Sequence, residues 1–162
     1  MRNVLVLGLA HSGASQVTRL VRNHGWHMGT VNEKNEHVQV VDCNNKILDG
    51  QVDIASMILS LAAIPKPCVI KDPRFIHTYD RWIELLSDYV MVYVDRDEID
   101  IWRIHHKHAK YMSVSIIKKD SESALLNYYR HSGPKMMVNG NMIYNPEAAD
   151  VFGRSLMELV TA

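Results

Sequence analysis

The sequence predicts an α/β fold with three layers, α/β/α, around a central, mainly parallel sheet. Short apolar runs at 4–7, 68–70 and 89–94 indicate buried strands, and a segment with helical spacing follows each of them. Each run also ends in polar residues, at 11–16, 71–74 and 95–98. Alternating strands and helices form parallel sheets with right-handed crossovers, and ligands bind beyond the carboxyl ends of such strands. We therefore expect the three polar segments to meet at one edge of the sheet.

The first half of the chain begins with the strand at 4–7. After it, Val17, Leu20 and Val21 recur at helical spacing, and Gly25 is a natural stop for that helix. We expect a second helix over 36–48, and a third over about 52–63 that ends before Pro65. These segments would lead to the strand at 68–70.

The second half continues the alternation of strands and helices. A short amphipathic helix is expected over 79–86, a strand over 89–94 and a helix from Ile99 to roughly Tyr111. A helix at 123–129, a weak strand at 136–138 and a last helix after Asn145 complete the pattern. The aromatic residues at 102, 128 and 129 are interpreted as packing residues.

Length and composition limit the class of protein. A chain of 162 residues with 47% hydrophobic residues predicts one domain, 1–162, with its own core. The two cysteines, Cys43 and Cys68, lack metal-ligand spacing and favour a reducing, cytoplasmic setting. The balance of 18 basic and 18 acidic side chains argues against a nucleic-acid partner. No apolar run is long enough to cross a membrane.

The residues after the first strand have the glycine spacing of a P-loop. Gly8 and Gly13 bracket four residues, and Ser15 follows at the position of the P-loop hydroxyl. In this pattern, backbone N–H groups and a helix N-terminus hold phosphate oxygens. Ala14 stands where the lysine of a nucleoside triphosphatase would reach the β- and γ-phosphates. The turn is therefore predicted to bind an anion without the usual triphosphate chemistry.

Four segments in order resemble the sulfotransferase family. The segment 7–16 is similar to the family's 5′-phosphosulfate loop, and 70–75 is similar to its Lys-Asp-Pro-Arg segment. The segment 92–97 resembles the strand whose arginine binds the 3′-phosphate of the donor, and 143–147 resembles the terminal strand-to-helix junction. The resemblance covers most of the chain and implies a P-loop-like domain.

The resemblance implies a donor, 3′-phosphoadenosine 5′-phosphosulfate, and transfer of its sulfuryl group to a hydroxyl or amine without a metal. Arg96 would neutralise the 3′-phosphate. His11 takes the place of the family's cation at the bridging oxygen, which predicts activity at acidic pH, where an imidazole is protonated. The 5′-phosphosulfate would be bound by the amides and hydroxyls of Ser12, Gly13, Ala14, Ser15 and Gln16.

The catalytic residues beyond the loop are expected near the second strand. Asp72 and His77 are candidates for the base that accepts the acceptor's proton. Lys71 and Arg74 would stabilise the sulfuryl oxygens. Alternatively, Asp72 and the proline after it cap a turn, and Lys71 is a solvated strand end.

Three functions remain open from the sequence. The leading one is sulfuryl transfer to a small-molecule or carbohydrate acceptor, whose identity the sequence does not encode. The second is a noncatalytic nucleotide- or anion-binding domain. Two departures from the sulfotransferase pattern favour it, His11 in place of the family's cation and Ile104 at a position where the resemblance implies a serine. The third is a P-loop small-molecule kinase, which Ala14 disfavours. The histidines at 105, 106 and 108 are interpreted as a solvated basic helix face and not as a metal site.

Overall fold

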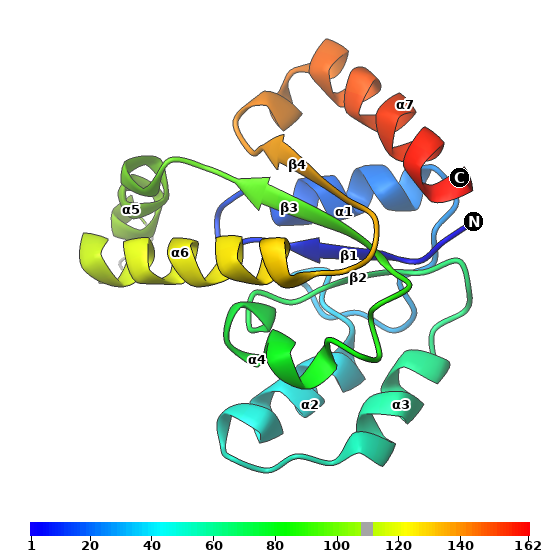
Figure 1. The fold of residues 1–162 in the computed structure, drawn as a ribbon. Helices are drawn as coiled ribbons and strands as arrows, with labels where there is room; N and C mark the ends of the chain where they lie inside the picture. The colour runs from blue at the N-terminus through cyan, green and yellow to red at the C-terminus, as the bar shows by residue number, and fades with distance from the viewer. Residues whose placement is uncertain (108–111) are drawn as a thin grey trace.

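The computed structural model, which describes residues 1–107 and 112–162, contains a sheet of four parallel strands (Figure 1). The strand order is β2-β1-β3-β4, so the first strand lies inside the sheet, with Val4 paired to Val69 on one side and Val90 on the other. The strands are β1 (Val4–Leu7), β2 (Val69–Lys71), β3 (Val90–Asp95) and β4 (Lys135–Asn139). All four predicted strands are confirmed.

Seven α-helices and a short 3-10 helix are assigned within the described residues. They are α1 (Ala14–Asn23), α2 (Val38–Leu48), α3 (Ile54–Ala62), α4 (Phe75–Trp82), α5 (Glu98–Lys107), α6 (Val114–Arg130), η1 (Met142–Tyr144) and α7 (Pro146–Thr161). The last helix starts after Asn145, whose side chain accepts hydrogen bonds from the first-turn amides at 147 and 148. The end of the helix predicted to reach Tyr111 falls at 108–111, outside the described residues.

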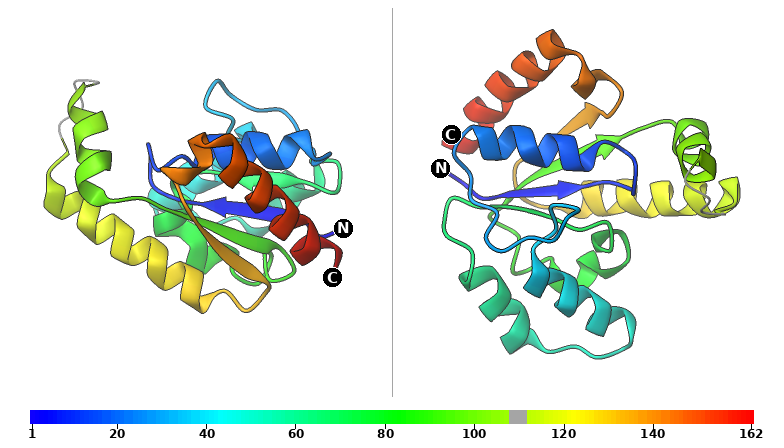
Figure 2. Two further views of the ribbon diagram at one scale, coloured as in Figure 1. Left: turned by 90° about the horizontal axis from the view of Figure 1, so that it is seen from above. Right: turned by 180° about the vertical axis from the view of Figure 1, so that it is seen from behind.

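The helices cover both faces of the sheet, as Figures 1 and 2 show. Because successive strand residues point to opposite faces, Val4 and Val6 pack with α1 and α7 in one core. Leu5 and Leu7 pack on the other face, in a core that α2, α3, α4 and α6 complete. The predicted three-layer α/β/α arrangement around a parallel sheet is confirmed.

Three helices differ from the sequence expectation. Helix α2 starts at Val38, so Glu36 belongs to the preceding loop. Helix α4 starts four residues earlier than expected, directly after Arg74. Helix α6 starts at Val114 instead of 123, because Ser113 caps its amide at Ile116 and the polar residues of its first turns face solvent. A mostly polar helix has a weak periodic signal, which explains the shorter prediction.

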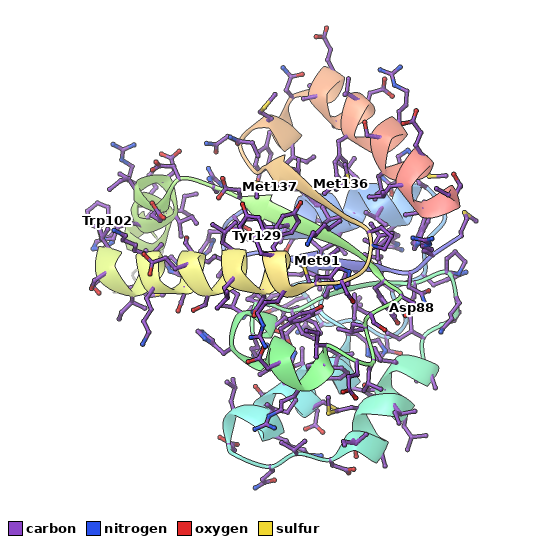
Figure 3. The ribbon with its side chains drawn as sticks, in the orientation of Figure 1. Asp88, Met91, Trp102, Tyr129, Met136 and Met137 are labelled. Carbon is purple, nitrogen blue, oxygen red and sulfur yellow. The ribbon has the colours of Figure 1, made fainter. Side chains whose placement is uncertain are left out.

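The aromatic residues of the second half are packing residues only in part. The Tyr128 ring lies 5.7 Å from the Tyr93 ring, and Trp102 lies 4.0 Å from the ring of His106. Tyr129, by contrast, is 65% exposed and projects from α6 (Figure 3). Across the described residues, we found no helix with both the length and the apolar character that spanning a membrane requires.

Candidate functional site

The turn between β1 and α1 is the candidate anion site. His11 and Gly13 both have left-handed backbone conformations, with φ of 67° and 104°, which reverse the chain toward the helix. The amide of Ser12 is bonded within the turn to the carbonyl of Leu9 at 3.1 Å. The amides at 13, 14 and 15 have no acceptor among the described residues. Such N–H groups at the start of a ten-residue helix are suited to bind anionic oxygens.

The loop after β4 packs directly against this turn. The amide of Gly140 donates to the carbonyl of Asp95 at 2.6 Å. A Cβ atom at Gly140 would lie 1.8 Å from the Ser12 carbonyl oxygen. The backbone of this loop therefore approaches the turn so closely that only glycine fits.

Arg96 comes from the end of β3 and contacts the same turn. Its Nη1 atom donates to the carbonyl of His11 at 2.9 Å, although 85 residues separate the two in the sequence. Its Nε atom is buried and has no hydrogen-bond partner among the described residues. The structure thus brings this predicted donor-binding arginine to the turn. Its contact with a 3′-phosphate stays a prediction.

Two cavities meet at the turn. The smaller, the turn cavity, has a volume of about 200 Å³ and extends from Gly13–Gln16 to Arg19 and Tyr144. The larger, the outer cavity, has a volume of about 410 Å³ and is lined by Lys34, Glu36, Pro73 and Arg74. Both cavities are also lined by the same four residues, which are Ala10, His11, Ser15 and Lys71.

Lys71 forms a buried ion pair at this shared wall. Its Nζ atom donates to Glu36 Oε1 at 2.9 Å, and the two side chains are 6% and 5% exposed. Burial acts to raise the pKa of the Glu36 carboxyl, but the hydrogen bond and charge of Lys71, helped by Asn32, outweigh it and hold this pKa below its ordinary value. Lys71 is therefore not the solvated strand end of the alternative interpretation.

Asp72 is fully enclosed below the outer cavity. Its Oδ1 atom accepts from the backbone amide and the guanidinium of Arg74, each at 2.9 Å, and its Oδ2 atom accepts from Asn44 at 2.9 Å. The carboxylate is not exposed and lines neither cavity. This geometry favours capping and orienting Arg74, while the role of Asp72 as a base stays a prediction without support from its position.

His77 lies on α4 beside a third cavity of about 230 Å³, which shares Ala10, Pro73 and Arg74 with the outer cavity. Its Nε2 atom is 3.5 Å from Asp120 Oδ1 on α6. Of the two candidate bases, His77 is thus the one whose ring reaches a cavity.

Of the five predicted loop residues, four line the turn cavity and one does not. Gly13, Ala14, Ser15 and Gln16 line the turn cavity, whereas the Ser12 side chain is buried inside the turn, without a hydrogen-bond partner among the described residues. A direct contact between the Ser12 hydroxyl and an anion therefore needs a rearrangement of the turn.

The predicted solvated face of histidines is wrong for His105. This ring is buried and packs edge-on against His11, with ring centroids 4.5 Å apart. His106 is exposed, as expected, and His108 lies outside the described residues. Within those residues, no group of three potential metal ligands comes together.

Sequence reasoning missed four polar residues of the site, one of which, Arg19, lies on α1 and lines the turn cavity. Glu36, Lys34 and Tyr144 line the cavities but belong to loops or to the short helix η1. The carbonyl of Lys34 accepts from Lys71 at 3.3 Å and from Ser15 at 3.4 Å, which fixes this loop against the site. The only signal in the sequence is an Asn at 32 that caps the loop through its side chain.

Two solved structures are similar to this chain. A gluconokinase from Sinorhizobium meliloti 1021 is 16% identical, with a TM-score of 0.53 over 97% of this chain and 94% of its own. The YorR protein of Bacillus subtilis, solved in complex with phosphorylated GDP, is 14% identical, with a TM-score of 0.50 over 96% of this chain and 97% of its own. No protein-family model and no curated protein sequence matches the chain.

At these identities, the likeness shows the fold and not the activity. The fold is that of P-loop proteins, of which one neighbour is described as a kinase and the other as bound to a nucleotide. Neither description names a sulfotransferase. The resemblance noted in the sequence is thus supported at the level of the P-loop fold, and membership of the sulfotransferase family is not shown.

Proposed function

We propose that the protein transfers a sulfuryl group from 3′-phosphoadenosine 5′-phosphosulfate to a hydroxyl or amine of a small-molecule or carbohydrate acceptor. One observation carries this choice among P-loop functions. Among the described residues, the turn cavity is lined by amides, hydroxyls and cations and by no carboxylate, and Ala14 removes the P-loop lysine. Transfer of a phosphoryl group from a triphosphate needs that lysine and acidic ligands for Mg²⁺, whereas sulfuryl transfer needs neither.

The proposed reaction is a single displacement at sulfur. The acceptor oxygen or nitrogen forms a bond to sulfur while the bond from sulfur to the bridging oxygen of the phosphosulfate breaks. The products are the sulfated acceptor and adenosine 3′,5′-bisphosphate, and the acceptor's proton passes to a base. Charge develops on the bridging oxygen, so cations at that point stabilise the transition state.

The two cavities suggest where each substrate lies. The phosphosulfate end of the donor would occupy the turn cavity, on the amides at 13–15, and the acceptor would enter from the outer cavity. His11 and Lys71 line both cavities, which supports a role for them at the transferred group. In this arrangement, protonated His11 stabilises the bridging oxygen. Lys71 keeps its bonds to Glu36 and to the carbonyl of Lys34 and stabilises the sulfuryl oxygens with its remaining N–H. His77, beside Asp120 in the adjoining third cavity, accepts the proton.

A small-molecule kinase is the second candidate, because one neighbour in fold is a gluconokinase. Ser15 occupies the position at which a P-loop hydroxyl binds Mg²⁺. The single acid among the residues that line the outer cavity, Glu36, already accepts a hydrogen bond from Lys71. A kinase would therefore need a different cation and a different metal ligand from those of the usual P-loop.

Titration calorimetry with two nucleotides separates the candidates. We expect adenosine 3′,5′-bisphosphate to bind without metal and ATP to bind more weakly, with or without Mg²⁺. Absence of bisphosphate binding at millimolar ligand overturns the proposal, and Mg²⁺-dependent ATP binding supports the kinase. Bisphosphate binding without sulfuryl transfer to any acceptor would assign the noncatalytic binding function. Once an acceptor is known, the His11→Ala variant should show a larger loss in turnover number than in affinity for the donor.

A further inference from the structure

We infer that the outer cavity binds an acceptor with an anionic group, held by Arg74, beside the hydroxyl that is modified. This inference rests on the proposed function and specifies its substrate class. The carboxylate, phosphate or sulfate would contact Arg74, and the accepting hydroxyl would point toward the wall formed by His11 and Lys71.

Arg74 is held on one side by the buried carboxylate of Asp72. Its side chain is 33% exposed, yet its Nη1 atom donates at 2.9 Å to Asp72, whose side chain is fully buried. Nη1 is also 3.6 Å from Glu36 Oε2. No partner is found in the described residues for its Nε and Nη2 atoms. One edge of the guanidinium is thus held by the protein and the other is available to a ligand.

The carboxylate that holds Arg74 belongs to a buried hydrogen-bond network. Asn44 donates to Asp72 at 2.9 Å, and the Oδ1 atom of Asn44 accepts from Thr78 at 2.7 Å and from the indole of Trp82 at 2.8 Å. All four side chains in this chain of contacts are buried. Burying a carboxylate is unfavourable unless its hydrogen bonds are satisfied, and here the satisfied network ends at one partly exposed cation. A guanidinium fixed in this way loses little freedom when it binds a planar or tetrahedral anion.

The outer cavity carries an excess of positive charge. Its basic residues are His11, Lys34, Lys71 and Arg74, and Glu36 is the single acid among its lining residues. Lys71 neutralises that acid within a closed pair. Arg74 is paired in turn with the buried Asp72. The excess positive charge at the cavity is therefore that of Lys34, which is exposed at its rim.

The size of the cavity limits the acceptor. A volume of about 410 Å³ is at the lower end of the range of small-molecule sites, so it fits a molecule of about the size of one sugar ring. A sugar acid or a sugar phosphate has both features that the site requires, an anion for Arg74 and a hydroxyl for transfer.

The test measures binding of D-glucuronate, glucose 6-phosphate and D-glucose to the protein by NMR titration. Adenosine 3′,5′-bisphosphate is present in excess so that the turn cavity is filled, and a second series omits it. We expect at least one anionic sugar to bind about tenfold more tightly than glucose. The stronger of the two anions identifies whether a carboxylate or a phosphate is preferred.

Variants assign the preference to Arg74. Arg74→Gln should reduce binding of the anionic sugars to that of glucose, and Arg74→Lys should retain part of the preference because it keeps the charge but not the planar fork. Arg81→Gln, an equal loss of charge at an exposed position on the same helix, should change nothing. If Arg74→Gln does not fold, Lys34→Gln replaces it and should lower the preference by about threefold.

Equal binding of charged and neutral sugars, no binding of either anion at millimolar concentration, or a preference that survives Arg74→Gln overturns the inference. The bisphosphate titration is read independently. Its failure with anion binding intact overturns the proposed donor and leaves the Arg74 subsite. Bisphosphate binding without any preference for anions removes the Arg74 subsite alone.

Discussion

The guanidinium of Arg96, at the end of β3, donates a hydrogen bond of 2.9 Å to the carbonyl of His11, whose backbone is left-handed. This contact ties β3 to the turn between β1 and α1. A non-glycine residue in this conformation costs roughly 1 kcal/mol, so it persists only where surrounding contacts hold it.

Replacing Arg96 with Gln should therefore weaken ligand binding at the turn. We expect the affinity for adenosine 3′,5′-bisphosphate to fall by about tenfold or more, because the charge-assisted hydrogen bond is lost. Calorimetry with the bisphosphate and with adenosine 5′-monophosphate measures this. A larger loss for the bisphosphate would place the 3′-phosphate on Arg96. Arg103→Gln, at an exposed ion pair with Asp100, is the matched control, and equal affinities for the two variants would contradict the prediction.

Glu36→Gln should destabilise the protein, because it leaves the Lys71 ammonium buried without its counter-charge. Removal of one partner of a buried pair costs roughly 3 kcal/mol, which urea unfolding measures directly. Asp42→Asn makes the same chemical change in the exposed pair with Lys46 and should leave stability unchanged. Similar unfolding midpoints for both variants would show that the buried pair is not a determinant of stability.

Gly140→Ala should disrupt the turn, because the added Cβ would overlap the Ser12 carbonyl oxygen. We expect lower stability and lost nucleotide binding. Gly153→Ala is the control, since this residue lies within α7 and a Cβ there meets only the His24 side chain, at 3.1 Å. His24 is exposed and can shift by the few tenths of an ångström that this contact requires. Alanine is favoured over glycine in a helix by about 1 kcal/mol, so this variant should be as stable as the parent or more stable. Thermal unfolding measures the change in stability of both variants. A Gly140→Ala variant as stable as the parent would refute the close approach of Gly140 to the Ser12 carbonyl.

Stability should fall over the interval that begins near pH 6.5 and continues down to the lower pKa values of two buried histidines in the folded protein. Burial lowers the pKa of both His37 and His131 below 6.5 in the folded protein, so the unfolded chain binds more protons over this interval. Stability is therefore complete above 6.5 and is lost as the pH falls toward the folded pKa values. Urea midpoints across the interval test this.

The variant His131→Asn should lower stability at all pH values but reduce the slope against pH. His131 shares a hydrogen bond of 2.6 Å with the Tyr79 hydroxyl and contacts the carbonyl of Tyr89 at 2.9 Å. An unchanged slope would assign the pH dependence elsewhere. Glu36 does not interfere, because its pKa is lowered from 4.5, and its contribution is lost only as the pH falls below that value.

Local patterns were sufficient to predict the strands and the turn. The run at 4–7 is apolar and rich in valine and leucine, and every one of its side chains is buried in the structure. A strand covered on both faces has this pattern whatever its neighbours are. The turn was predicted for a similar reason, since its glycine spacing is a property of the backbone.

The pairing of Lys71 with Glu36 was not predictable in the same way. The two residues are 35 positions apart, and Glu36 comes from a loop whose path depends on tertiary contacts. The network behind Arg74 was missed because Asn44 seemed an ordinary polar residue of a helix, and only the structure shows that it is buried below Asp72. The chemistry of the site also could not be taken from the fold, since P-loop folds support several group transfers.

The shared wall of Ala10, His11, Ser15 and Lys71 has a thermodynamic consequence. Any ligand that shifts this wall from one side alters the affinity on the other side, and the coupling must be reciprocal. If binding of the first ligand changes the affinity for the second by some factor, binding of the second changes the affinity for the first by the same factor. Cooperativity between ligands of the two cavities would thus depend on how far these four residues move when either ligand binds.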